Sequence, residues 1–261
     1  MSGIITATII VAVVGIFIGV FLGIAAIWFR VEVDPREEEI LGVLPGNNCG
    51  GCGFPGCSGL AAAIVTGDAK VNGCPVGGEP VATKIAEIMG VEAEVSEKVV
   101  AFVKCQGDCD KAKVDYDYYG TKDCSMMKFI PGGGSKTCNY GCLGFGNCVT
   151  ACEFDSIHIV NGVAVVDKET CTSCGACINA CPKDLIELVP YKQKTKVACY
   201  SKDKGPVVKK GCDVGCIGCS LCVKNCPNEA IKVTDFLAKI DYTKCTDCGI
   251  CREKCPTKAI I

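Results

Sequence analysis

The spacing of its cysteines is the feature that most constrains how this chain can fold. The 261 residues include 25 cysteines, and most of them fall in short C-x-x-C groups. So many thiols predict either a disulfide framework or metal ligation. Disulfide frameworks are typical of short secreted chains with scattered cysteines. This chain is not short, and its cysteines are grouped. We therefore interpret the groups as sites where several thiolates converge on a metal centre.

Iron–sulfur clusters explain the groups better than zinc does. Zinc sites commonly combine cysteine with histidine, and the chain has a single histidine, His158. A cysteine-only zinc ribbon needs two C-x-x-C pairs, whereas the groups here are three or four cysteines long. Four thiolates are the usual ligands of a [4Fe–4S] cluster. The net charge of −2, with no strongly basic domain, argues against nucleic acid as a partner.

The N-terminal segment predicts a transmembrane helix, followed by domains on the cytoplasmic side. Residues Ile4–Phe29 are uncharged, and as a helix they would extend about 39 Å, beyond the ~30 Å hydrocarbon core. A signal peptide would need a basic start and a shorter apolar run, so we favour a permanent anchor over residues 1–30. Gly15, Gly19 and Gly23 are spaced by four, which suits packing against other membrane helices of a complex. Exposed thiols belong in a reducing cytoplasm, which orients the anchor in the cell membrane.

Residues 31–100 are expected to form a small helical domain with one cluster. Its cysteines follow the pattern C-x2-C-x4-C-x16-C, and the four ligands are Cys49, Cys52, Cys57 and Cys74. The backbone beside them is rich in glycine, notably Gly50, Gly51 and Gly53. Such glycines let the chain wrap closely around a cluster and offer amides to its sulfurs. Helices are predicted over Ser58–Thr66 and Pro80–Met89, each ended by the glycine that follows.

The C-terminal half repeats the two-cluster ferredoxin pattern C-x2-C-x2-C-x3-C-P. Three copies are complete, at residues 171–182, 216–227 and 245–256. In such pairs the fourth cysteine of one run ligates the cluster of the other run. The second ferredoxin-like module, residues 191–261, is therefore expected to hold two clusters. Their ligand sets are Cys216, Cys219, Cys222 and Cys255, and Cys245, Cys248, Cys251 and Cys226.

A fourth copy of the pattern is degenerate and lies in the first module, residues 101–190. Phe145 stands where the second module has Cys219, and Glu153 replaces the proline. One complete ligand set remains, made of Cys152, Cys171, Cys174 and Cys177. The companion set has Cys142, Cys148 and Cys181, and Cys138 is the natural substitute for its missing ligand. Matching hairpins are predicted after each first motif, over Ile157–Val166 and Ile231–Ile240.

Five cysteines lie outside these five sets: Cys105, Cys109, Cys124, Cys199 and Cys212. They also follow the repeat, because Val103-Lys-Cys105 resembles Val197-Ala-Cys199 and Cys212 aligns with Cys138. Four of the five could bind a sixth cluster where the two modules meet, or they are buried structural thiols. Five clusters are thus expected, and the sequence leaves the sixth open.

With these motifs in place, the chain resembles the B subunit of Rnf-type ferredoxin:NAD oxidoreductases over nearly its whole length. The segment Leu44–Cys57 carries the most specific part of the resemblance. The resemblance implies a membrane complex of several subunits that moves electrons from reduced ferredoxin toward NAD and couples this to pumping Na⁺ or H⁺. It implies the longer form of the family, since other members have one ferredoxin domain. Family members also serve complexes that reduce a redox-sensing regulator.

No motif predicts a site for nicotinamide, flavin or acid–base catalysis. Gly132-Gly133-Gly134 lacks the strand–turn–helix context of a dinucleotide site, and His158 falls in a predicted strand, where it is expected to pack. The chain is therefore expected to be an α+β electron wire within an oxidoreductase. A stand-alone membrane-tethered polyferredoxin is one alternative. A corrinoid-binding methyl-transfer protein is another, but it would need a barrel of ~250 residues, for which the chain has no room.

Lysines are concentrated between the two modules. Residues Tyr191–Lys210 hold seven lysines, opposed only by Asp203. Small ferredoxins are commonly acidic, so this segment, Lys192–Lys210, predicts a docking site that steers reduced ferredoxin toward nearby clusters. The alternative is a lysine-rich linker that only keeps a mobile segment solvated.

Overall fold

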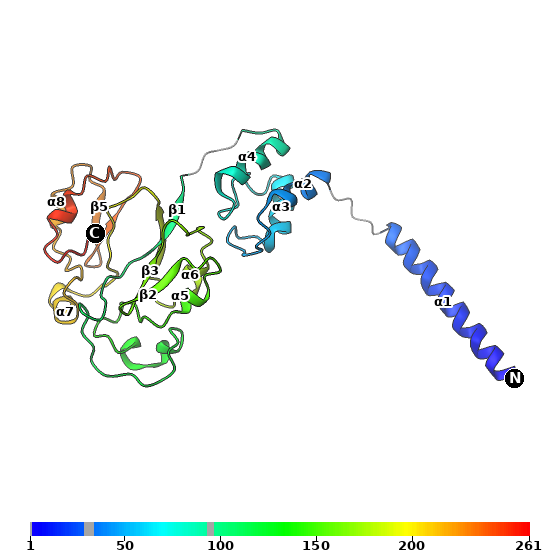
Figure 1. The fold of residues 1–261 in the computed structure, drawn as a ribbon, viewed down its shortest axis with the longest axis horizontal. Helices are drawn as coiled ribbons and strands as arrows, with labels where there is room; N and C mark the ends of the chain where they lie inside the picture. Colours follow the sequence, from blue (N-terminus) through cyan, green and yellow to red (C-terminus); the bar gives the residue numbers. More distant parts are fainter. Residues whose placement is uncertain (1, 29–33, 93–96) are drawn as a thin grey trace.

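The computed structural model describes residues 2–28, 34–92 and 97–261 (Figure 1). The helices of this part are α1 (Ser2–Trp28), α2 (Pro35–Val43), α3 (Gly56–Thr66), α4 (Gly78–Met89), α5 (Asn147–Thr150), α6 (Ala176–Ala180), α7 (Gly205–Gly211), α8 (Leu221–Lys224) and α9 (Ile250–Glu253). The strands are β1 (Val99–Val103), β2 (Ile157–Val160), β3 (Val163–Val166), β4 (Ile186–Pro190), β5 (Ile231–Thr234) and β6 (Leu237–Ile240). Two 3₁₀ turns, η1 (Met126–Phe129) and η2 (Pro131–Gly133), lie in the long loop after β1. Helices and short antiparallel strands together give the expected α+β composition.

α1 is a single uncharged helix that extends away from the other elements (Figure 1). Its large apolar side chains are exposed, among them Phe17 at 71% and Trp28 at 84%. Across the described part of the chain, no helix combines the length and hydropathy of a candidate membrane span. The predicted transmembrane helix is therefore not confirmed. Its last residue, Phe29, and the predicted boundary after residue 30 lie outside the described residues.

α2, α3 and α4 pack around one apolar core to form the four-cysteine domain. Ile40 of α2, Leu60 and Ile64 of α3 and Ile85 of α4 are at most 1% exposed. α3 and α4 end where the sequence predicts, because the next residue in each case is a glycine with a positive φ. Each helix begins two residues earlier than expected, so both predictions are confirmed to within half a turn.

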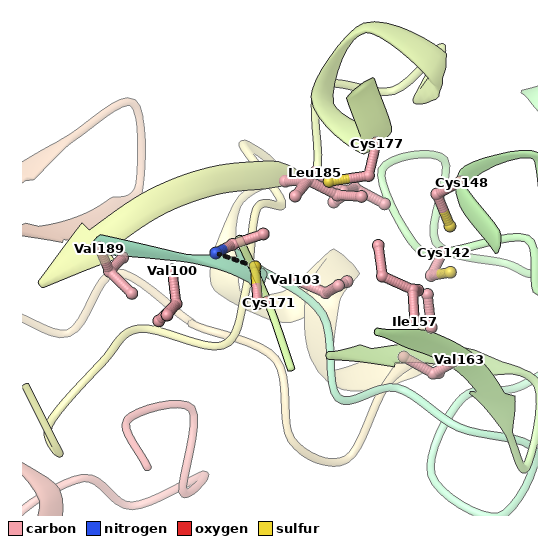
Figure 2. Packing of buried hydrophobic residues seen from close by; sticks show 13 residues of the cluster. Val100, Val103, Cys142, Cys148, Ile157, Val163, Cys171, Cys177, Leu185 and Val189 are labelled. Carbon is pink, nitrogen blue, oxygen red and sulfur yellow. Dashed lines mark hydrogen bonds between the residues drawn. The ribbon is translucent and has the colours of Figure 1, made fainter. Parts of the chain in front are cut away.

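The first ferredoxin-like module is built from two antiparallel strand pairs. β1 pairs with β4, with Val103 opposite Ile186, and β2 pairs with β3 in the predicted hairpin. Figure 2 shows the buried side chains of this module, which β1, β4 and the hairpin surround. The predicted boundary between residues 100 and 101 falls inside β1, so the module begins at the start of that strand.

The second module repeats this arrangement. β5 and β6 form the second predicted hairpin. Val197 lies opposite Ile260, and the backbones of Lys196 and Ile261 exchange two hydrogen bonds of 2.9 Å. This short pairing is the counterpart of β1 with β4. The segment between the modules is therefore part of the fold, and every second residue from Gln193 to Val197 is buried.

Candidate metal centres

Three of the four cysteines expected to form the N-terminal site, Cys52, Cys57 and Cys74, pack against the core of that domain near α3. Cys57 lies in the first turn of α3, and its amide donates to the Asn48 side-chain oxygen at 2.8 Å, which shapes the preceding loop. Burial raises the pKa of the Cys74 thiol, and the nearby thiols of Cys57 and Cys52 raise it further. The Gly77 amide donates to the Cys74 sulfur at 3.3 Å. The Cys74 thiol therefore lies near those of Cys52 and Cys57, although it follows them by more than 15 residues in the sequence.

Short helices position the third cysteine of each ferredoxin-type run. These buried residues are Cys148 in α5, Cys177 in α6, Cys222 in α8 and Cys251 in α9. Each helix follows a residue in the left-handed conformation, which is glycine in three runs and Ser220 in the fourth. A residue in this conformation turns the chain sharply, and glycine adopts it with little conformational strain because it has no Cβ atom. The turn aims the third sulfur back toward the other cysteines of its group.

The second module gathers its cysteines in the two sets expected from the sequence. One pocket is lined by Cys216, Cys219, Cys222 and Cys255, and another by Cys226, Cys245, Cys248 and Cys251. The exchange of the fourth cysteine between runs therefore appears in the fold itself. The side-chain amide of Gln193 donates to the Cys245 sulfur at 3.3 Å, which ties the intermodule segment to the second of these pockets.

The first module gathers Cys177 with the three other cysteines of its complete motif set, Cys152, Cys171 and Cys174. Burial raises the pKa of Cys177 to about 11. The Ala101 amide of β1 donates to the Cys171 sulfur at 3.5 Å, the dashed line in Figure 2. The Ser156 amide donates to the Cys152 sulfur at 3.4 Å.

The pocket at the degenerate motif brings together a different fourth cysteine from the one that the sequence suggests. The pocket beside α5 is lined by Cys142, Cys148, Cys181 and Cys124, and Cys138 does not line it. Figure 2 shows Cys142 and Cys148 side by side, apart from Cys171. Burial raises the pKa of Cys148 to about 12, with further increases from the thiols of Cys142, Cys181 and Cys124.

A hydrogen bond explains why Cys124 reaches this pocket. The Cys124 amide donates to the side-chain oxygen of Asn147 at 2.9 Å, and the Asn147 amide group donates to Asp123 at 3.0 Å. Asn147 is the first residue of α5, so this pair of bonds ties a distant loop to the motif helix. One feature of the sequence indicates this arrangement, namely that Cys138 aligns with Cys212 in the internal repeat. The structure places those two cysteines together in a different pocket.

A further group of four cysteines lies where the two modules meet. Cys105, Cys138, Cys199 and Cys212 line one pocket. Three of the five cysteines outside the predicted sets, Cys105, Cys199 and Cys212, therefore line this pocket. A fourth, Cys124, lines the pocket beside α5. The last, Cys109, is exposed.

The donor chemistry of the motif sites fits [4Fe–4S] clusters. Among the described residues, three of their pockets are each lined by four thiols and by no carboxylate or imidazole. Backbone amides already point at several motif sulfurs. Thr172, next to Cys171, has a buried hydroxyl that finds no partner within the described residues, and a cluster sulfide could accept a hydrogen bond from it. Within the same residues, no group of three or more cysteine, histidine or acidic side chains is arranged to hold a single metal ion.

The four-cysteine domain and the first module touch at one ligand loop. A Cβ atom built on Gly51 would collide with the carbonyl oxygen of Cys174. Only glycine permits so close an approach, and the next residue, Cys52, belongs to the N-terminal group. The two groups are therefore adjacent across this contact.

Comparison with known families finds three iron–sulfur matches. Residues 44–76 match a family described as "Putative Fe-S cluster", residues 164–187 match a 4Fe-4S binding domain, and residues 215–260 match a 4Fe-4S dicluster domain. These ranges contain the N-terminal group and all three complete copies of the ferredoxin pattern.

Similar proteins cover nearly the whole chain. The B subunit of the Na(+)-translocating ferredoxin:NAD(+) oxidoreductase complex of Acetobacterium woodii is 49% identical over 90% of this chain and 71% of its own length. The B subunit of the ion-translocating oxidoreductase complex of Methanosarcina acetivorans is 46% identical over 99% of this chain and 98% of its own. The B subunit of the proton-translocating ferredoxin:NAD(+) oxidoreductase complex of Clostridium ljungdahlii is 42% identical over 94% and 87%.

Proposed function

Because the chain belongs to the family of B subunits of ion-translocating ferredoxin:NAD oxidoreductase complexes, we propose that it accepts electrons from reduced ferredoxin and passes them to partner subunits. It is an iron–sulfur electron-transfer subunit, and its [4Fe–4S] clusters carry one electron at a time. Hydride transfer to NAD and the coupled movement of Na⁺ or H⁺ belong to the partners. The observation that carries this proposal is the gathering of four thiols at each of several separate sites.

We assign clusters to five ligand sets. Four sets are those read from the sequence: Cys49, Cys52, Cys57 and Cys74; Cys152, Cys171, Cys174 and Cys177; Cys216, Cys219, Cys222 and Cys255; and Cys226, Cys245, Cys248 and Cys251. The fifth is Cys124, Cys142, Cys148 and Cys181, in which Cys124 takes the place given to Cys138 by the sequence. The contact of Gly51 with Cys174 supports electron transfer between the N-terminal cluster and the first module.

α1 is the element that would hold the chain in a membrane complex. It carries no charged residue, and large apolar side chains from Ile5 to Trp28 are exposed where the structure describes them, a surface that needs lipid or other helices to cover it. Nothing lies within 4 Å of a Cβ atom built on Gly15, Gly19 or Gly23, which leaves that face free for a partner helix. The cluster domains then lie on the cytoplasmic side, where thiols stay reduced.

The lysine-rich segment supports a docking site for ferredoxin. Six of its seven lysines are exposed, while Gln193, Thr195 and Val197 between them are buried. Lys194 and Thr195 are held by backbone hydrogen bonds to Asp247, at 2.9 and 2.7 Å, beside the Cys245 and Cys248 ligands. A folded segment therefore presents positive charge next to a cluster site, which a loose solvated linker would not do.

Anaerobic purification with iron and sulfide analysis tests this function. We expect about 20 iron atoms or more per chain, with EPR signals that appear on mixing with chemically reduced ferredoxin. Fewer than about 16 iron atoms after full reconstitution would contradict the assignment of two modules. Other subunits should copurify from membranes. A loaded chain that ferredoxin reduces but that has no copurifying partner would be a stand-alone polyferredoxin instead.

A further inference from the structure

We propose that Cys105, Cys138, Cys199 and Cys212 bind one more [4Fe–4S] cluster, held jointly by the two modules, through which electrons cross from one module to the other. This inference rests on the proposed electron-transfer function and extends it to a site outside the ferredoxin-type motifs. None of the matched family regions contains these residues.

The internal repeat makes the site symmetric. Cys105 and Cys199 occupy equivalent positions, two residues after the strand that pairs with the end of each module. Cys138 and Cys212 are also equivalent, four residues before the first motif cysteine of their module. Each module therefore supplies the same two thiols, and the site is complete only when both modules are present.

Hydrogen bonds repeat with the same symmetry. The Cys142 amide donates to the Cys105 sulfur at 3.3 Å, and the Cys216 amide donates to the Cys199 sulfur at 3.2 Å. Amides that point at sulfur in this way also mark the motif sites, and they stabilise the negative charge of a bound cluster. The donors Cys142 and Cys216 are themselves ligands of the neighbouring clusters. The group is thus connected by one hydrogen bond to a cluster site in each module.

The four sulfurs converge on one pocket. The Cys212 thiol interacts with those of Cys105 and Cys138, and the Cys199 thiol with that of Cys138. A Cβ atom built on Gly107 would lie 3.3 Å from the Cys212 sulfur and 3.8 Å from the Cys105 sulfur. Sulfurs from different modules therefore flank the same glycine. Buried structural thiols would have no reason to converge across an interface.

The pocket is as large as those at the motif sites. Its free volume is about 30 Å³, against about 30 Å³ beside Cys124 and about 20 and 10 Å³ in the second module. The pocket between the modules is therefore at least as large as the pockets to which clusters are assigned above.

Two lysines add positive charge beside the pocket. The buried Lys136 amine, which lines the pocket, donates to the carbonyl oxygens of Gly107 and Gly162 at 2.8 and 3.1 Å. The Lys183 amine donates to the Asn139 carbonyl oxygen at 2.8 Å and lies near the thiols of Cys138, Cys142, Cys105 and Cys124. A [4Fe–4S] cluster with four thiolates is an anion, so cations here favour its binding.

The step through this site is a one-electron transfer that makes or breaks no bond. A reduced cluster in one module is oxidised by one electron, and the shared cluster is reduced by it. The shared cluster then returns to its oxidised form as it reduces a cluster of the other module. Reduced ferredoxin supplies the electrons under the proposed function.

Iron analysis of the full chain tests the proposal directly. The wild-type protein should hold about 24 iron atoms per chain, and the single variants Cys199→Ser and Cys212→Ser should each hold about 20. Both variants should also slow the reduction of one module when ferredoxin reduces the other, followed by freeze-quench EPR. Cys109→Ser is the matched control, because this exposed thiol lies outside the group, and its iron content should equal that of the wild type.

Cys219→Ser separates this inference from the proposed function, because it removes a ligand of a motif site. If Cys219→Ser loses four iron atoms while Cys199→Ser and Cys212→Ser lose none, the shared cluster is disproved and the motif clusters stand. A wild-type content of about 20 iron atoms would disprove it without any variant. One zinc ion per chain that is lost with Cys199 would assign the group to zinc and would also overturn the proposal.

Discussion

The two ferredoxin-like modules share a scaffold but gather their groups of four cysteines differently. In both, a hairpin follows the first motif with the same register, since Ile157 opposes Val166 and Ile231 opposes Ile240. The second module takes all its motif ligands from the repeat. The first has Phe145 at a ligand position and draws Cys124 from a loop instead. The strands and hairpins of the module are therefore kept although one motif cysteine is missing, and another chain segment brings a thiol to the same pocket.

The segment before the first motif makes this substitution feasible. In the second module, the short segment of residues 200–215 between Cys199 and Cys216 contains the helix α7. In the first module, the corresponding residues 106–141 form a longer loop with η1 and η2, and this loop carries Cys124. The additional length lets the loop reach α5, where Asn147 holds it. The difference between the modules is thus concentrated in one insertion.

The largest expected effect comes from removing the substitute ligand. Cys124→Ser should lower the iron content by about four atoms per chain, because a four-iron site would lose one of its thiolates. Adding Phe145→Cys should restore those atoms, since position 145 corresponds to Cys219 in the intact copy. Iron analysis and EPR of the single and double variants measure both effects.

Cys138→Ser is the companion to that experiment. It should also lose about four iron atoms, but from the site between the modules, so Phe145→Cys should leave its iron content unchanged. Rescue of Cys138→Ser by Phe145→Cys would show that Cys138, not Cys124, completes the degenerate motif.

A smaller effect should measure how similar the two hairpins are. Ile157→Ala and Ile231→Ala each remove a side chain that is at most 3% exposed, so each should destabilise its module by about 2–5 kcal/mol. Hydrogen exchange of the hairpin amides under anaerobic conditions reports the local opening free energy. Val160→Ala, at an exposed position of β2, is the control and should change little. Clearly unequal costs at Ile157 and Ile231 would mean that the two scaffolds are not equivalent.

The smallest effect concerns the cluster of lysines in the segment between the two modules. Changing Lys192, Lys194, Lys202 and Lys204 to glutamine should slow association with reduced ferredoxin at low salt. The difference should fade as the Debye length falls from ~10 Å at 0.1 M salt to ~3 Å at 1 M. Stopped-flow rates across this range measure it, and constant iron content shows that the clusters are intact. An unchanged rate at low salt would place docking elsewhere, with the outer face of residues 245–255 as the next candidate.

Local signals in the sequence were sufficient for elements that depend on neighbouring residues. The glycines after Thr66 and Met89 predicted the ends of α3 and α4, and the repeat predicted both hairpins. The motif spacing also predicted which cysteines of the second module lie together, because short helices and left-handed turns place them locally. These parts needed no knowledge of the rest of the chain.

The choice between Cys124 and Cys138 depended on information that spacing does not contain. Cys138 is near Cys142 in sequence, yet the alignment of Cys138 with Cys212 was the better guide to its position. Cys124 reaches its pocket through a side-chain hydrogen bond to Asn147, across 23 positions of chain. Such long-range contacts arise from the path of a loop, which residue spacing alone does not reveal. Spacing also does not reveal that all of β1, from Val99, belongs with β4, because that is recognisable only through the pairing of the two strands.

The group between the modules has a consequence for how the protein is made. Cys105 emerges from the ribosome long before Cys212, so this site stays open while the first module already has its own cysteines and strands. Contacts between such distant segments form slowly, because a long loop must close before they can form. Under the proposed cluster assignment, the first module can therefore receive its clusters during synthesis, whereas the site between the modules is filled last. The order of translation would then set the order of cluster insertion, and a chain released before Cys212 would leave two half-buried thiols, Cys105 and Cys138, at an unfinished surface.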